Sequence, residues 1–381
     1  MNRREQILKY IDKDQLGIEI GPYWSPLTPK REGYNCLVMD VFDTQTTRGR
    51  AAENPTLSAE NTAKIEEVDL VGSCTHIDQI VEQAGRLGEF DYIVSSHNFE
   101  HLPNPIRFLQ GCAKVLKPGG VISMAIPDHR ACYDYFRPVT RLSDWLDAWL
   151  HDRSRPTFAQ AFDDQWVRAA YDHHGVPHGS FFQGVDPDLV SAATTLEKEF
   201  SEWKARMASQ DAAYHDAHCS VFTPSSLELL LRDSAYLGLI QFEVVEISSS
   251  PGVDIFIHLR RSSSVDALHP ADYPKNRNTL LHRILDEGAD ASTLGKKNRR
   301  TDFDQIETQI DVARNESDIY RSALEDVRAE LGQSYRDLHA GQDEINRLRD
   351  ALAAVKGSTS WRLTAPIRSL KRVCNRLRQA T

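Results

Sequence analysis

Two short segments near the amino terminus carry residues suited to holding a nucleoside. Glu19 and Gly21 end one apolar run, and Asp40 ends the next. A glycine at the first turn lets the backbone approach a ligand closely, and an acid at the tip of the second strand can accept both hydroxyls of a ribose. The pairing predicts a nucleoside ligand without saying which one.

The turn after Gly21 argues against a nicotinamide dinucleotide. That ligand requires G-x-G-x-x-G followed by a helix whose N-terminus holds the pyrophosphate. Pro22, Pro26 and Pro29 follow instead, so no regular helix is expected there. S-adenosylmethionine has no phosphate and fits better. Taken alone, the Glu-x-Gly-Pro pattern is equally compatible with an ordinary strand-ending turn.

The elements that position these residues follow from the alternation of apolar runs and helical patterns. It predicts a mostly parallel sheet with helices on both faces. The expected strands are 16–20, 36–40, 68–71, 90–95, 121–126, 242–247 and 254–259, and the expected helices are 4–11, 75–87, 106–116 and 224–236. The last two strands are too close together for a helical crossover, so we expect them to pair antiparallel.

A long stretch, 127–221, interrupts this alternation. It holds seven of the fourteen histidines and four of the six tryptophans. Because ligands of open parallel sheets bind at the carboxyl edge, we expect an insertion there on the substrate side. Its aromatic residues could stack on sugar rings, but we expect more of them to form the core of the insertion.

Several motifs, in this order and spacing, resemble class I S-adenosylmethionine-dependent methyltransferases. The most similar subgroup is that of bacterial O-antigen and other surface-polysaccharide gene clusters. The resemblance covers about residues 1–261, and its motifs are GIEIGP at 17–22, MDVFDT at 39–44, HNFEHL at 97–102, VLKPGG at 115–120 and HCSVFTP at 218–224.

The resemblance implies a Rossmann-like, seven-stranded methyltransferase sheet with S-adenosyl-L-methionine as cofactor. The implied cofactor-binding residues are Glu19 and Gly21 against the methionine part, Asp40 on the ribose, Gly72 and Ser73 facing adenine, and His97 and His101 beside the sulfonium. Family members often carry an acid in the turn after the third strand. This chain has none in Gly72-Ser73-Cys74.

Methylation of a sugar hydroxyl requires a base to take its proton, and a histidine titrating near neutrality suits that task. Our catalytic candidates are His97, Asp128, His129 and His173, the last together with its neighbour His174. The first three fall at the carboxyl ends of the predicted fourth and fifth strands. Taken one at a time, histidines are more often structural than catalytic.

A metal site is not predicted. The histidines of the insertion that could be ligands are His173, His174, His178, His215 and His218. Neither an H-E-x-x-H motif nor a carboxylate triad accompanies them, although a divalent ion can assist hydroxyl methylation.

Beyond the methyltransferase-like domain, the composition of 262–300 is that of a linker. A heptad repeat then runs through 301–355, and thirteen of its sixteen a and d positions are apolar. This predicts an α-helical coiled coil that pairs with a second copy or with a glycosyltransferase. The alternative is a single long helix folded back on the body.

The last segment, 356–381, contains seven Lys and Arg residues and no acid. Its apolar residues recur at roughly helical spacing, so it could lie on an anionic membrane surface; the alternative is a tail that packs on a partner or stays disordered. The formal net charge of -10 argues against a nucleic-acid partner. Six scattered cysteines and a charged start predict a cytoplasmic protein, peripheral at the inner membrane through this tail.

The function expected from these features is O-methylation of a sugar hydroxyl in a surface polysaccharide or glycolipid intermediate. One alternative is a weak or inactive methyltransferase-like scaffold that recruits glycosyltransferases through the coiled coil. Another is a methyltransferase whose acceptor is a small metabolite or a protein.

Overall fold

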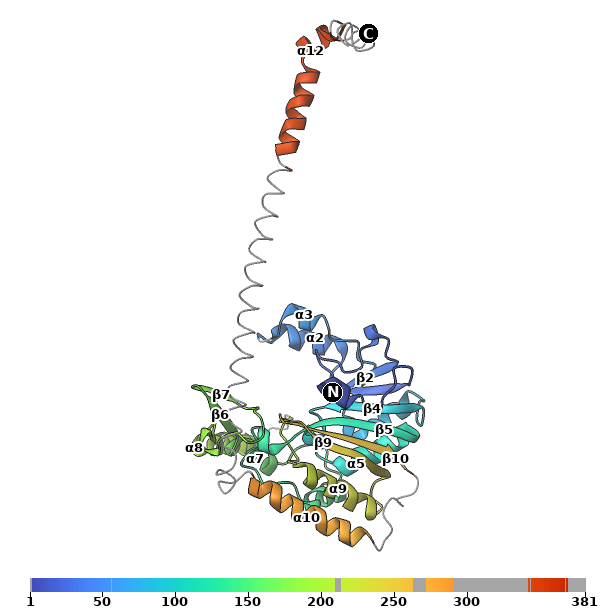
Figure 1. Ribbon diagram of the computed structural model, residues 1–381, viewed down its shortest axis with the longest axis vertical. Helices are drawn as coiled ribbons and strands as arrows, with labels where there is room; N and C mark the ends of the chain where they lie inside the picture. Colours follow the sequence, from blue (N-terminus) through green and yellow to red (C-terminus); the bar gives the residue numbers. More distant parts are fainter. Residues whose placement is uncertain are drawn as a thin grey trace, which may run out of the picture. The chain divides into compact units, whose positions relative to one another are not determined.

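The computed structural model describes residues 2–55, 57–209, 214–262, 272–290, 342, 344–366 and 368 (Figure 1). The chain divides into two compact units, Met1–Arg300 and Thr301–Thr381. The first unit contains the sheet and everything that positions the candidate site.

A seven-stranded sheet forms the centre of the first unit, with strand order β3-β2-β1-β4-β5-β10-β9. The strands are β1 Gly17–Ile20, β2 Cys36–Asp40, β3 Leu70–Val71, β4 Phe90–Ser96, β5 Leu116–Pro127, β9 Phe242–Ser249 and β10 Asp254–Arg261. The first five run parallel, whereas β10 is antiparallel to both β5 and β9. The predicted Rossmann-like sheet and its antiparallel final pair are therefore confirmed.

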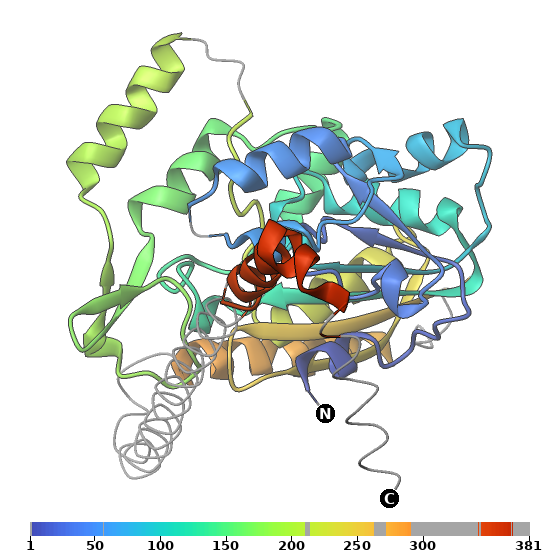
Figure 2. The same cartoon turned by 90° about the horizontal axis from the view of Figure 1, so that it is seen from above.

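Side chains alternate between the two faces of this sheet, as the pleat requires. On β4, Ile93 belongs to the larger apolar core, while its neighbours Tyr92 and Val94 belong to the smaller one. Helices α4 Ile77–Gln83, α5 Pro105–Val115 and α9 Pro224–Tyr236 supply the larger core, and α1 Arg3–Ile7 supplies the smaller. Figure 2 shows the sheet between these layers.

Local sequence explains where these helices begin. Asn104 caps α5 by accepting the Arg107 N–H at 3.1 Å, and Thr223 caps α9. Each is followed by a proline at the first helical position, where the missing N–H costs nothing. The turn after β1 contains only the 3-10 turn η1 Lys30–Glu32, as the prolines there predicted. Helices α2 Thr44–Glu53 and α3 Ala59–Thr62 were not predicted.

The insertion forms its own small layer beside the carboxyl edge of the sheet. It comprises α6 Leu142–Leu150, α7 Phe158–Trp166, β6 Ala169–His173, β7 Val176–His178, β8 Val190–Ala192 and α8 Leu196–Ser209. The three strands pair in the order β7-β6-β8. Trp145 of α6 is 1% exposed and packs edge-on against Phe99 at 5.8 Å, so this aromatic residue belongs to the main core.

One part of the predicted linker is wrong. Helix α10 Tyr273–Asp290 lies within 262–300 and packs on α9. The Tyr273 ring stacks on Tyr236 at 3.9 Å, and its hydroxyl and the Arg277 guanidinium both donate to Asp233. The contacts that hold this helix come from α9, so the composition of the segment itself gave no sign of them.

In the second unit, residues 344–357 are helical and α12 Thr359–Leu363 follows, capped by Ser358. Most of the predicted coiled coil lies outside the described residues. Among the residues that the structure describes, no helix is long and apolar enough to span a membrane.

The packing of β1 on β4 can be tested at Gly17. A Cβ at this position would lie 2.0 Å from the buried Tyr92 ring, so Gly17→Ala should lower the free energy of unfolding by about 1–3 kcal/mol or more. Gly49→Ala is the matched control, because nothing lies within 4 Å of its added Cβ in the exposed α2. That variant should gain about 0.5–1 kcal/mol. Urea denaturation measures both, and equal stability of the two variants would contradict the packing.

Candidate functional site

The carboxyl ends of β1, β2 and β3 lie side by side and are joined through the backbone. Gly21 has a φ of +61° and donates its N–H to the Met39 carbonyl at 2.8 Å. Gly72, with a φ of +147°, donates to the Asp40 carbonyl at 2.9 Å. Both glycines adopt backbone conformations that side chains disfavour. The result is an edge of bare backbone with one carboxylate, Asp40, at its middle.

The Asp40 carboxylate is half-buried at this edge. Its Oδ1 accepts the Phe42 N–H at 3.2 Å. Burial raises the pKa of Asp40, and backbone hydrogen bonds oppose that rise. The residue predicted to hold a ribose therefore lies at the expected strand end, with Ser73 in the neighbouring turn after β3.

Glu19 has a different task from the predicted contact with methionine. It is 2% exposed, and its two oxygens accept the N–H groups of Leu27 and Thr28 at 2.6 and 2.8 Å and the Thr28 hydroxyl at 2.7 Å. These bonds fix the proline-containing loop after β1. Burial raises the pKa of Glu19, partly offset by these three hydrogen bonds.

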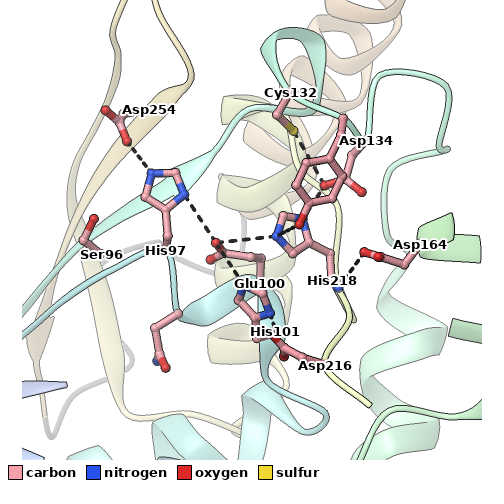
Figure 3. Close-up of polar contacts among 12 residues, drawn as sticks. Ser96, His97, Glu100, His101, Cys132, Asp134, Asp164, Asp216, His218 and Asp254 are labelled. Atoms are coloured by element: carbon pink, nitrogen blue, oxygen red, sulfur yellow. Dashed lines mark hydrogen bonds and ion pairs between the residues drawn. The ribbon is translucent and has the colours of Figure 1, made fainter. Parts of the chain in front are cut away.

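A cluster of histidines surrounds Glu100 at the end of β4 (Figure 3). Glu100 lies in the 3-10 turn η3 Phe99–His101 and is 0% exposed. Its Oε1 is 3.5 Å from His97 Nδ1, 3.8 Å from His101 Nε2 and 3.9 Å from His218 Nε2. We call these four residues the Glu100 cluster.

In each histidine of the Glu100 cluster, the ring nitrogen that does not face Glu100 contacts another carboxylate. His97 Nε2 contacts Asp254 of β10 at 3.0 Å, and His101 Nδ1 contacts Asp216 at 2.9 Å. His218 Nδ1 contacts Asp134 of the insertion. The three outer carboxylates come from three different parts of the chain, and each fixes the orientation of one ring.

These contacts set the protonation of the cluster. Burial alone would lower the pKa of His97, but Asp254 and Glu100 raise it to about 9. In this arrangement His97 carries a proton at neutral pH, so it is poorly suited to the predicted role of proton acceptor. The pKa of His101 is also raised. Burial alone would lower it, but Asp216 and Glu100 raise it. The pKa of Asp254 falls to about 2 despite burial, through His97 and Arg3.

A second buried ion network supports the first. Arg137, 7% exposed, donates to Asp134 at 2.7 Å and lies 3.7 Å from Asp164. Although burial raises the pKa of Asp134, His218 and Arg137 bring it to about 2. Asp164 also accepts the backbone N–H of His218 at 2.9 Å. The beginning of the insertion is thereby joined to its last segment, which carries His218.

Two other predicted catalytic residues are engaged in different ways. Asp128 is 0% exposed and forms a two-point ion pair with Arg130, at 2.9 and 2.6 Å, while Gln183 also donates to it at 3.1 Å. It is therefore a structural anchor rather than a free base. Burial lowers the pKa of His129, so this residue is neutral at pH 7. No ion pair joins either residue to Glu100 within the described part of the chain.

His173 lies on β6 of the small sheet. Its ring packs on Tyr171 at 5.9 Å and on His174 at 4.3 Å, both on the same hairpin. These described ring contacts do not bring it to His97. Of the predicted catalytic residues, the structure thus places only His97 in the Glu100 cluster.

Comparison with known proteins decides the family. A family model described as a methyltransferase domain matches residues 5–236 of the 381-residue chain. The chain belongs to this methyltransferase family. A search of curated proteins gave no match for this methyltransferase.

Solved structures similar to the methyltransferase come from several organisms. They include SAM-dependent methyltransferases from Aquifex aeolicus (11% identity, covering 68% of this chain and 89% of that chain, TM-score 0.34) and Methanosarcina mazei (15%, 68% and 97%, 0.32). An S-adenosylmethionine-dependent methyltransferase from Mesorhizobium loti is 11% identical, covers 68% and 99% of the two chains, and has a TM-score of 0.31. Likenesses of this size do not bear on the acceptor.

S-adenosyl-L-methionine is the cofactor expected of the methyltransferase, and its residues fit this cofactor. A Cβ built on Gly21 would meet nothing within 4 Å, which leaves room for a ligand against the backbone. Asp40 supplies an acceptor for hydroxyl groups at the next strand end. The turn after β3 contains Thr75 Oγ1, a buried oxygen without a hydrogen bond among the described residues.

Asp40 should carry a large share of cofactor affinity. Hydrogen bonds to a charged group contribute about 1.5–3 kcal/mol each, so Asp40→Ala should weaken binding of S-adenosylmethionine by roughly ten- to a hundredfold. Isothermal titration calorimetry measures this. Asp286→Ala, exposed on α10, is the control and should bind as the unaltered chain does. Equal affinity of both variants would remove Asp40 from the binding site.

Proposed function

We propose that the methyltransferase O-methylates a sugar hydroxyl of a surface polysaccharide or glycolipid intermediate on the cytoplasmic side of the membrane. The observation that carries this proposal is the Glu100 cluster. It lies at the end of β4, on the same edge as Gly21 and Asp40, and beside the insertion. A hydroxyl, unlike a thiol or an amine, requires strong help in losing its proton at neutral pH.

The cofactor supplies a methyl group already activated on a sulfonium. Residues of the chain then hold the acceptor in line with it, and such positioning contributes much of the rate. As the new carbon–oxygen bond forms and the carbon–sulfur bond breaks, the hydroxyl proton passes to the Glu100 cluster. Within that cluster the Glu100 carboxylate is the group that accepts the proton.

The acceptor class rests on two further features. The insertion brings aromatic side chains to the cluster: the Tyr133 ring packs on His218 at 4.6 Å, and Arg168 lies over Tyr133 at 3.6 Å. Those two contacts cover the Tyr133 ring, and exposed aromatic side chains of the insertion such as Phe136, Trp149 and Trp166 are the surfaces that suit a sugar ring. The motifs shared with the polysaccharide-cluster subgroup support the same class.

A transfer assay tests this function. With radiolabelled S-adenosylmethionine and glycans extracted from the bacterial surface, the unaltered chain should transfer label to the glycan fraction. Glu100→Gln should lower kcat by about 10²–10⁴-fold, the usual contribution of a positioned proton acceptor. Glu243→Gln, paired with Arg260 on the last strand of the sheet, is the matched control and should keep full activity.

Label appearing only in small metabolites or in protein would overturn the glycan proposal. It would leave the methyltransferase assignment intact. Full activity of Glu100→Gln would remove the Glu100 cluster from the reaction.

The carboxy-terminal unit, we propose, pairs with a second copy of itself through a coiled coil over 301–355. In the described helix, Ile345, Leu348, Leu352 and Val355 occupy successive a and d positions. They are 46%, 61%, 50% and 49% exposed, so none of the residues that the structure describes covers this apolar seam. Such a seam is stabilised by a partner helix.

The basic tail, 356–381, is proposed to lie on an anionic membrane surface. Trp361 is stacked under the Arg368 guanidinium at 3.6 Å, and Leu363 is 76% exposed. An interfacial segment combines apolar and cationic groups in this way. Each Lys or Arg near an anionic leaflet contributes about 1 kcal/mol.

A truncation series separates these two proposals. A chain ending at residue 355 should keep the mass of two copies in light scattering but lose flotation with anionic vesicles. A chain ending at residue 300 should be a single copy and should also fail to float. Vesicles of neutral lipid are the control. Flotation of the chain ending at 355, or a single-copy full chain, would contradict the tail or the coiled coil respectively.

A further inference from the structure

The chemistry of the Glu100 cluster is incomplete without a cation. Both carboxylate oxygens of Glu100 are buried and accept no hydrogen bond among the described residues. A buried carboxylate without partners is strongly destabilising. Such a group is rare unless something supplies positive charge next to it.

None of the three histidines forms a hydrogen bond to Glu100, and the nearest, His97 Nδ1, stands 3.5 Å from Oε1. Charge-assisted N–H···O bonds are about 2.7–2.9 Å long. His101 Nε2 and His218 Nε2 stand 3.8 and 3.9 Å from Glu100 Oε1, too far for such a bond. Their other ring nitrogens face Asp216 and Asp134. When Nδ1 of each ring donates to its carboxylate, Nε2 presents a lone pair toward Glu100.

This is the arrangement found around protein-bound metal ions. A ligating histidine donates its second ring N–H to a carboxylate, which fixes the tautomer and makes the ligand more basic. Here both rings have such a carboxylate, and both point their remaining nitrogen at one buried glutamate (Figure 3). The ligand atoms of Glu100, His101 and His218 all lie within 4.8 Å of one another.

We propose that Glu100, His101 and His218 bind a divalent transition-metal ion, with Zn²⁺ fitting best. Two histidines and one glutamate form a set that Zn²⁺ accepts, and three protein ligands leave a position open for another oxygen. Donors held at about 2.1 Å around a tetrahedral ion stand about 3.4 Å apart. The two distances from Glu100 to the histidines, 3.8 and 3.9 Å, exceed this by about 0.4 and 0.5 Å, and no pair of the three donor atoms is more than 4.8 Å apart.

Hydrogen bonds to the backbone already hold the segments that carry Glu100 and His218 next to each other. The Ser220 N–H donates to the Glu100 carbonyl at 3.1 Å, which ties the segment carrying His218 to η3. Arg137 donates to the His218 carbonyl at 2.9 Å. The site is thus assembled from turns that are anchored independently of any ion.

One contact must change when the ion binds. The Tyr133 hydroxyl is 2.6 Å from His218 Nε2, at the nitrogen assigned to the metal. The tyrosine must give up this hydrogen bond on coordination. Its removal should therefore leave affinity unchanged or increase it.

A neighbouring group of possible ligands does not qualify. Asp134, Asp164 and His218 also lie close together. Arg137 and Arg168, at 2.7 and 3.2 Å, already neutralise the two aspartates. The cations in that group form close ion pairs with the two aspartates, whereas the nearest histidine nitrogen to Glu100, His97 Nδ1, stands 3.5 Å from Oε1.

The inferred ion departs from the sequence-based expectation of no metal. The catalytic use of this ion rests on the proposed function: one Glu100 oxygen would hold the ion, which would act as a Lewis acid toward the acceptor hydroxyl, and the other Glu100 oxygen would accept the hydroxyl proton. Binding of the ion does not rest on it. The test therefore measures binding alone, without cofactor or acceptor.

The experiment uses the full chain, stripped with a chelator and titrated with Zn²⁺ or Co²⁺. We expect one ion per chain by calorimetry, and Co²⁺ absorption bands typical of four-coordinate nitrogen and oxygen ligands. Asp216→Asn should weaken affinity by about 10–100-fold, as loss of a histidine's outer carboxylate does, and His101→Gln should weaken it further. Asp216 is exposed, so its variant tests the site without disturbing the core.

Two controls complete the test. His151→Gln, on an exposed histidine after α6, should bind as the unaltered chain does, and Tyr133→Phe should bind at least as tightly. Absence of a stoichiometric ion, or equal binding by His101→Gln and the unaltered chain, would overturn the proposal. Ion binding without methyl transfer would instead count against the proposed function only.

Discussion

A single buried charge organises the functional half of this molecule. Glu100 is 0% exposed, and a carboxylate in that position is costly unless positive charge surrounds it. Three histidine rings gather around it, and each requires a carboxylate of its own. Those carboxylates come from β10 and from the beginning and the end of the insertion. Compensation of one charge thus links parts of the chain that are distant in sequence.

The sheet and its cofactor edge could be predicted from the sequence because the patterns that determine them are local. Apolar runs, the Pro105 and Pro224 helix starts, and the glycine and acid at strand ends all lie within a few residues of what they determine. The expected positions of Gly21 and Asp40 followed directly. Glu19 was placed at the correct strand end, but its contacts with Leu27 and Thr28 depend on how the following loop folds back.

The Glu100 cluster could be predicted from the sequence only in part, for a physical reason. His97 and His101 were singled out within the HNFEHL motif at 97–102, but His218 lies more than a hundred positions away, and nothing in either segment signals the other. Asp128 looked like a free base because its pairing with Arg130 is a matter of side-chain geometry. Likewise, His173 was chosen because it is a histidine of the insertion, yet it lies on the separate small sheet.

Helix α10 also changes where the catalytic unit ends. Asp233 on α9 is 5% exposed, and its partners Tyr273 and Arg277 both come from α10. A chain cut after the last strand would leave this aspartate without either partner and would uncover the face of Tyr236. The segment with the composition of a linker therefore contains a helix that belongs to the catalytic unit. A shortened or recombined enzyme therefore needs α10 together with the sheet. The heptad repeat at 301–355 can be replaced without removing the contacts of α10.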